Sequence, residues 1–253
     1  MTFDAKELLA KMQPNQKINY DSLLQKLIKE WKKAETKPRI LLHSCCAPCS
    51  TYTLEYLTKY AEVDVYYANS NIHPRVEYER RAIVQKEFIE KFNQDYNQEV
   101  GFILAPYEPS KWIKMVAEQN IQDAKEGGER CAACFDYRLD QVANKAQSDG
   151  YDYFASALTI SPHKNSQLIN QIGFDVQMMY DARYLPSDFK KNNGYKRSVE
   201  MCDIYDIYRQ CYCGCVYAAK QQGVDFKQVT KSAKEYVSQN SHKIDWTIHQ
   251  TRL

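Results

Sequence analysis

The sequence lacks a long hydrophobic run and a strong excess of charge of either sign. Its only stretch resembling a hydrophobic run, Arg39–His43, is far too short to span a membrane. The N-terminal segment MTFDAKELLAK carries charge where a signal peptide would need an apolar core. The net charge of +2 is smaller than that of most dedicated nucleic-acid-binding proteins, although it does not exclude a nucleic-acid substrate. We therefore expect a soluble, cytoplasmic protein without a membrane partner.

Cysteine is the informative residue type, because the chain has 9 of them and no secretion signal. Cytosolic reductants keep thiols reduced, so clustered cysteines indicate metal binding or catalysis rather than disulfides. Two cysteines, Cys202 and Cys211, stand outside the close spacing and are expected to be ordinary buried thiols. The other seven form three close groups, namely Cys45, Cys46 and Cys49, then Cys131 and Cys134, then Cys213 and Cys215.

Each group has a spacing that suits metal ligation. Neighbouring cysteines make a strained disulfide, whereas a turning backbone can point both thiolates of Cys45 and Cys46 at one centre. A C-x-x-C motif that opens a helix places its sulfurs near backbone amides, which favours the thiolate. Gly214 allows the backbone between Cys213 and Cys215 to bend sharply. Four thiolates satisfy one zinc ion or one iron–sulfur cluster, so this larger set suggests a cluster plus a second metal.

Alternation of strands and helices predicts an α/β fold, with a parallel sheet covered by helices on both faces. We expect strands at Arg39–Ser44, Val63–Ala68, Glu99–Ala105 and Tyr151–Ala157, with helices between them. Residues 1–36 are predicted to be a helical extension, residues 37–222 an α/β catalytic domain with the metal site, and residues 223–253 a C-terminal helix and tail. Ligands of such sheets lie beyond the carboxyl ends of the strands. Three loops there carry distinctive residues: CCAPCS, NSNIHP and LTISPHKN.

Several other residues in or near these loops are candidates for catalysis or substrate binding. His73 is either a proton donor or a loop histidine that binds the backbone. Arg138 either faces the cysteines or lies on a solvated helix face. For Glu77, Arg80 and Arg81, a solvated helix face with ion pairs is the ordinary expectation. Further candidates around the predicted site are Asn71, Ser161, His163, Lys164 and Arg209. In SPHK, Ser161 either contacts substrate or caps the next helix.

A basic segment around NNGY fits contact with RNA. Lys190 and Arg197 flank Tyr195, a combination suited to a phosphate backbone and a splayed base, with a plain solvated loop as the rival interpretation.

Five long motifs in this order resemble the QueH family of epoxyqueuosine reductases. They are LLHSCCAPCS, NSNIHPRVEYERR, GERCAACFDYRLD, TISPHKN and YRQCYCGCVY, and the resemblance runs from about Ile40 to Tyr217. It implies a fold like that of the nucleotide-binding α-hydrolase-like (HUP) proteins, with CCAPCS in place of their phosphate-binding loop. It also implies a tRNA substrate carrying epoxyqueuosine at the wobble position, whose epoxide oxygen is removed by a two-electron reduction. This would be the last step of queuosine biosynthesis.

The resemblance implies a 4Fe–4S cluster and a neighbouring iron ion, supplied with electrons by an external donor. By motif, the ligands would be Cys45, Cys46, Cys131, Cys134, Cys213 and Cys215; for Cys49 the resemblance leaves ligation or dispensability open. Two other functions remain open at this point. One is a zinc-stapled RNA-binding module without catalysis, and the other is a thiol–disulfide enzyme built on the Cys131–Cys134 motif.

Overall fold

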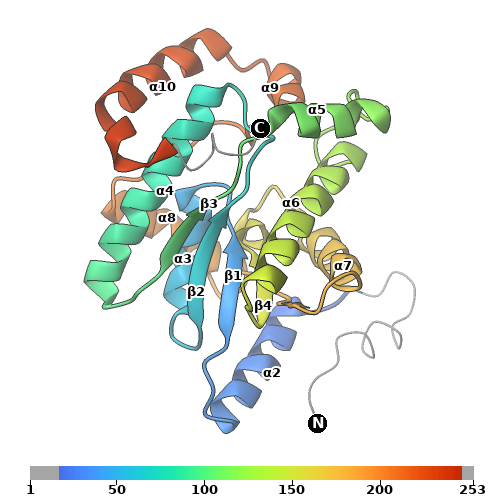
Figure 1. The fold of residues 1–253 in the computed structure, drawn as a ribbon, viewed down its shortest axis with the longest axis vertical. Coiled ribbons are helices and arrows are strands. Elements are labelled where there is room, and N and C mark those ends of the chain that lie inside the picture. The colour runs from blue at the N-terminus through green and yellow to red at the C-terminus, as the bar shows by residue number, and fades with distance from the viewer. Residues whose placement is uncertain (1–16, 247–253) are drawn as a thin grey trace.

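A computed structural model describes residues 17–246, and its centre is a five-stranded parallel sheet (Figure 1). The strands are β1 (Arg39–His43), β2 (Glu62–Tyr67), β3 (Gly101–Leu104), β4 (Tyr153–Ser156) and β5 (Arg183–Tyr184), in the order β3-β2-β1-β4-β5. This confirms the predicted α/β class and its four strands. The fifth strand was not predicted, because two residues are too few to show a periodic pattern.

Helices cover the sheet on both faces. They are α2 (Tyr20–Lys33), α3 (Ala47–Leu57), α4 (Arg75–Tyr96), α5 (Pro109–Glu118), α6 (Glu129–Ser148), α7 (Ser166–Gln177), α8 (Gly194–Ile204), α9 (Val216–Gln221) and α10 (Phe226–Asn240). Two short 3₁₀ helices are η1 (Ala157–Ile160) and η2 (Ser241–Lys243). Helix α3 has a proline in its first turn, where proline is well tolerated. The sequence pattern predicts that α3 and α6 begin near Tyr52 and at Cys134, but these two helices begin earlier, at Ala47 and Glu129. As a result, Cys49 and Cys131 each lie in the first turn of a helix.

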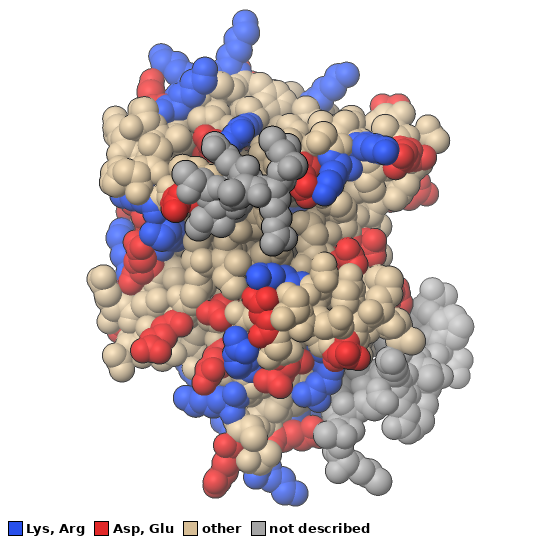
Figure 2. All heavy atoms as spheres, viewed as in Figure 1, with Lys and Arg blue, Asp and Glu red and all other residues tan. Residues whose placement is uncertain are grey.

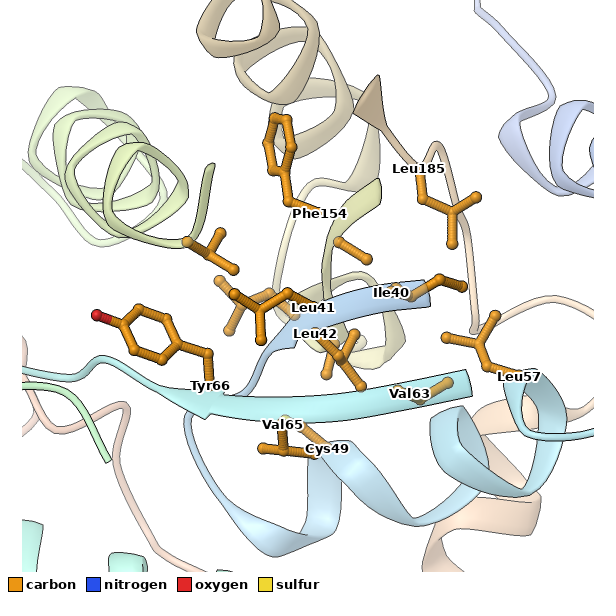
Figure 3. Packing of buried hydrophobic residues seen from close by; sticks show 14 of the residues in the cluster. Ile40, Leu41, Leu42, Cys49, Leu57, Val63, Val65, Tyr66, Phe154 and Leu185 are labelled. Atoms are coloured by element: carbon orange, nitrogen blue, oxygen red, sulfur yellow. The ribbon is translucent and has the colours of Figure 1, made fainter. Parts of the chain in front are cut away.

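Strand β1 is the centre of the hydrophobic core. Ile40, Leu41 and Leu42 are completely buried, since β1 pairs with β2 on one side and with β4 on the other. Figure 3 shows these side chains between Leu57 of α3 and Phe154 of β4. A strand buried on both faces reads as a continuous apolar run, which explains why RILLH lacks the alternation of a half-exposed strand.

Helix α2 belongs to the same core. Its apolar residues recur at helical spacing, and Leu24, Leu27 and Trp31 are buried in one cluster with the sheet. The predicted N-terminal helical segment around Leu8 and Met12 lies outside the described residues. At the other end of the chain, α10 packs along α4, in agreement with the expected C-terminal helix (Figure 1).

The order of the sheet reverses between β1 and β4, and this position defines the site. The chain leaves β1 toward β2 and leaves β4 toward β5, so the connections diverge on the two sides of these neighbouring strands. The loops that follow their carboxyl ends flank a crevice, which is where open parallel sheets bind ligands. Those loops contain Cys45 and Cys46 after β1, and Ser161 to Lys164 after η1. Among the helices of residues 17–246, none is long and apolar enough to cross a bilayer.

Helix α2 should contribute measurably to the stability of the fold. Replacing Leu27, which is buried in the core, by alanine should lower the free energy of unfolding by about 2–5 kcal/mol. The exposed neighbour Lys26 provides the control, since Lys26→Ala should change it by no more than about 0.5 kcal/mol. Urea unfolding of the full-length chain measures both. Equal values for the two variants would show that α2 is not part of the core.

Candidate metal centre

Three cysteines meet directly after β1. The sulfur atoms are separated by 3.5 Å between Cys45 and Cys46, 3.7 Å between Cys45 and Cys49, and 3.4 Å between Cys46 and Cys49. Cys46 is the extended residue that precedes α3, and the first turn of this helix brings Cys49 back beside it. Metal–sulfur bonds of about 2.3 Å place tetrahedral ligands about 3.8 Å apart. The buried triad therefore could hold one metal ion.

A second group of thiols lies at the beginnings of α6 and α9. The backbone amide of Gly127, in the turn that leads into α6, donates a hydrogen bond to Sγ of Cys131 at 3.1 Å. Cys134 and Cys215 are buried in one small cluster with Trp112. Cys215 is the residue directly before α9, and Cys213 precedes it in the same loop. All nine cysteines are free thiols.

Two cations lie among both groups of thiols. Arg138 is 1% exposed, which decides against the solvated helix face. Burial opposes its charge, but the thiolates of Cys134, Cys213 and Cys45 raise the pKa of the guanidinium above its ordinary value. The thiolate of Cys213 likewise raises the pKa of the Lys164 ammonium, against the effect of burial. The two cysteine groups therefore share one electrostatic environment.

Without a metal ion, burial and mutual contacts shift the pKa values of several of these thiols. A hydrogen bond to Cys45 raises the pKa of Cys46 to about 12, and the pKa of Cys49 is raised by its hydrogen bonds to the two others. The same contacts lower the pKa of Cys45. Burial raises the pKa of Cys134 to about 11. A cation that displaces these protons would convert repelling thiolates into ligands.

The polar side chains around the thiols are incompletely satisfied within the described part of the chain. Nη2 of Arg138, both amide atoms of Asn71 and Oε1 of Gln210 are buried there without a hydrogen-bond partner. Nε2 of Gln210 donates to Sγ of Cys46 at 2.9 Å. Unpaired buried polar groups are costly and rare, so their presence beside thiols fits a site that takes up a further group.

A pocket of about 370 Å³ opens beside Cys213. Ser161, His163 and Lys164 line it from the loop after η1, together with Gln210 from the opposite loop. The structure thus brings together Cys213 and the substrate-binding candidates of SPHK. Ser161 does not cap the following helix, because Asn165 occupies that position and accepts the first amides of α7. Cys211 also lines the pocket and is exposed, so its predicted burial is wrong, whereas Cys202 is buried as expected.

His73 lies on the NSNIHP loop, which packs against the last cysteine loop. Its backbone amide donates to the carbonyl of Gly214 at 2.8 Å, and its Nδ1 lies 3.1 Å from the carbonyl of Asn71. Burial lowers the pKa of His73, so the imidazole is held toward its neutral form. The histidine is thus both a residue that binds the loop backbone and a neighbour of the site.

The remaining candidates lie farther out. Lys190 binds the carbonyls of Thr159 and Lys164, at 3.3 and 3.2 Å. Arg197 pairs with Glu55 through two nitrogen atoms, at 2.6 and 3.0 Å. Tyr195, near the start of α8, is exposed, and so is Arg209.

Sequence reasoning missed the role of Arg81. An arginine four residues after Glu77 on a helix ordinarily indicates a solvated ion pair. Here both side chains are fully buried, and Arg81 binds backbone carbonyls of the last cysteine loop. The sequence around this pair, EYERR, has no feature that distinguishes a buried pair from a surface pair.

Fold and site together define a class: an α/β protein with a buried thiol centre, able to hold a metal ion, at the switch point of a parallel sheet. The sequence profile of the family described as "Epoxyqueuosine reductase QueH" matches residues 40–221, and the chain belongs to this family. A protein of Streptococcus pyogenes named epoxyqueuosine reductase QueH is 59% identical over 96% of this chain and 95% of its own length. A protein of the same name from Staphylococcus aureus is 60% identical over 93% of this chain and 98% of its own length. One from Thermotoga maritima is 28% identical, over 76% of this chain and 96% of its own length.

The triad makes a direct prediction for metal binding. Cys49→Ser should weaken binding of Zn²⁺ to the reduced full-length protein by at least about tenfold, because it removes one of three converging thiolates. Cys202→Ser, which changes a buried thiol outside the cysteine motifs, should bind as tightly as the unmodified chain. Competition with a chromogenic chelator measures both affinities. Equal affinities of the two variants would exclude Cys49 as a ligand.

Proposed function

We propose that this chain is an epoxyqueuosine reductase that acts on tRNA carrying epoxyqueuosine and converts this nucleoside to queuosine. The observation that carries the proposal is the buried cysteine triad at the switch point, which shares the cations Arg138 and Lys164 with other motif cysteines, in a chain that matches its relatives of that name along nearly its whole length. We place the activity in the cytoplasm and in the α/β part, residues 37–222.

We further propose that these cysteines hold a 4Fe–4S cluster and an additional iron ion. Seven thiols exceed the four that one tetrahedral ion requires, and the donor set is purely sulfur, which suits iron–sulfur chemistry. When bound, the metal centre would supply single electrons and a Lewis acid for the epoxide oxygen. The triad would provide Cys45, Cys46 and Cys49, and the second group the remaining four ligands.

Removal of the epoxide oxygen consumes two electrons and two protons, and it breaks both carbon–oxygen bonds to give a carbon–carbon double bond and water. The electrons come from an external donor. The chain's own residues would handle the charge and the protons. Arg138 and Lys164 offer fixed positive charge where an alkoxide develops, and the buried Nη2 of Arg138 is free within the described residues to donate to it. His73, kept near neutrality, would exchange protons at its imidazole.

The modified base would enter the pocket beside Cys213 and contact Ser161, His163 and Lys164. The amide of Asn71, buried without a hydrogen-bond partner within the described residues, is a further proposed substrate contact. Figure 2 shows basic and acidic side chains interspersed on one face of the molecule, so this face has no broad basic surface, and we propose that tRNA binds through local contacts. Tyr195, exposed on α8, and the exposed Arg209 are proposed tRNA contacts outside the pocket. Lys190 and Arg197 would have to exchange their present partners for phosphates.

The decisive experiment is a reduction assay on protein purified without oxygen. We expect a brown protein with iron and acid-labile sulfide that converts epoxyqueuosine in tRNA to queuosine, seen as the loss of one oxygen atom in nucleoside mass spectrometry. Cys45→Ser should abolish this conversion, whereas Cys202→Ser should retain it. A colourless protein that contains only zinc, resists reconstitution with iron and sulfide, and still binds tRNA would replace the proposal by a zinc-stapled RNA-binding module.

Arg138 should affect turnover more than metal content. Arg138→Lys keeps the charge but loses the branched donor group, so kcat should fall by about 10²–10³-fold, as for the loss of one stabilising donor. Iron content per chain should stay close to that of the unmodified protein. A variant that loses iron and turnover in parallel would assign Arg138 to the support of the metal site instead.

A further inference from the structure

The loop with the last two motif cysteines has no regular secondary structure of its own. Residues 205–215 connect α8 to α9, and Cys213 and Cys215 lie at the end of this connection. Irregular loops are usually the mobile part of a fold. Metal ligands need fixed geometry, so something outside the loop must hold it.

Arg81 of α4 meets this loop at two successive carbonyl groups. Its Nη1 donates to the carbonyl of Cys213 at 3.0 Å, and its Nη2 donates to that of Tyr212 at 3.2 Å. The guanidinium also lies over the ring of Tyr212, 5.1 Å from its centroid. The backbone on the N-terminal side of Gly214 is therefore fixed by one side chain.

Glu77 holds Arg81 in this position. Its Oε1 accepts from Nε of Arg81 at 2.7 Å and from the hydroxyl of Tyr208 at 3.1 Å. Both charged side chains are at most 1% exposed. A buried ion pair contributes little more stability than an apolar pair of the same size. Stability alone therefore does not explain this pair, and the geometry of its hydrogen bonds suggests a function. The fork of arginine binds a carboxylate and two carbonyls at once from three separate nitrogen atoms, whereas lysine presents all its donors on one nitrogen.

Gly214 completes the contact. It has φ +115°, a conformation that side chains rarely adopt, and a Cβ there would lie 2.7 Å from Cγ1 of Ile72 and 3.2 Å from Nη1 of Arg81. The carbonyl of Gly214 accepts the amide of His73, and the hydroxyl of Tyr212 donates to the carbonyl of His73. The loop of residues 205–215 thus packs closely against both α4 and the NSNIHP loop.

We propose that the buried Glu77–Arg81 pair is a positioning pair, which holds Cys213 and Cys215 in the geometry that binds metal. The inference rests on the proposed function in one respect, namely that these two cysteines are metal ligands. The pair does not contact the substrate. It acts through the backbone of the cysteine loop, as outer partners of metal ligands do.

The test compares Arg81→Lys with Arg75→Lys in the full-length protein. Arg75 forms the same type of ion pair, with Glu79 four residues on along α4, but its side chain is 68% exposed. In Arg81→Lys, alkylation of Cys213 and Cys215 should be at least about tenfold faster, measured by mass spectrometry relative to the exposed Cys211 in the same molecule. Metal loss to a chelator should be about 10–100-fold faster. Arg75→Lys should match the unmodified protein in both measurements.

Unchanged alkylation and metal retention in folded Arg81→Lys would overturn the proposal. If this variant does not fold, Tyr208→Phe decides, because it removes only the hydroxyl that binds Glu77. It should accelerate alkylation of the two cysteines in the same direction by a smaller factor, and no acceleration would overturn the proposal. Faster alkylation in a protein that contains no metal would support the positioning role while refuting the proposed metal centre.

Discussion

Mutual repulsion of buried thiolates is the constraint on which the site depends. The switch point of the sheet holds the buried triad of Cys45, Cys46 and Cys49, and burial and proximity raise the pKa of Cys46, Cys49 and Cys134. The fold offsets part of the free-energy cost of holding several buried thiolates close together. Three helices begin at cysteines, since Cys46 and Cys215 precede α3 and α9 and Cys131 lies in the first turn of α6. Helix N-termini favour negative charge, and Arg138 and Lys164 add fixed positive charge. A bound metal cation would offset the remaining repulsion among the thiolates. The arrangement is therefore suited to a metallocentre rather than to a free thiol catalyst.

Helix α4 links the loops that carry these cysteines. Oε1 of Gln85 accepts hydrogen bonds from the hydroxyls of Ser44 and Ser50, which flank the first cysteine group, at 3.2 and 3.0 Å. One turn earlier on the same face, Arg81 binds the loop of Cys213. A single rigid helix thus sets the distance between two cysteine groups that are far apart in sequence. Asn69 connects the loops as well, donating to the carbonyl of Ser44 and accepting from Arg138. The polar network specifies the site geometry, whereas the apolar core specifies only where the crevice lies.

The parts of the structure that follow from local pattern could be predicted from sequence. The apolar run of β1, the strand–helix alternation and the cysteine spacing were sufficient for the parallel sheet and for the convergence of Cys45 and Cys46. The mutual contact of Cys49 with both depended on α3 beginning at Ala47, earlier than its apolar residues indicate. The burial of Glu77 and Arg81 could not be predicted, because local spacing does not show which long-range partner covers a helix face. The same reason accounts for Arg197, whose partner Glu55 is 142 residues away.

The match to the family profile ends at residue 221. The segment that follows it packs against helix α4. Helix α10 packs along α4, and the backbone carbonyl of Lys243 accepts a hydrogen bond from Lys86 at 2.7 Å. Tyr236 and Lys243 both bind the carboxylate of Glu87. These contacts lie one or two residues beyond Gln85, which faces the first cysteine group. Helix α4 is therefore held on its outer side by α10 while its inner side holds two cysteine loops. A helix fixed from both sides cannot rotate or shift along its axis without breaking contacts on each, so α10 stabilises the spacing of the cysteines without contributing a residue to the site.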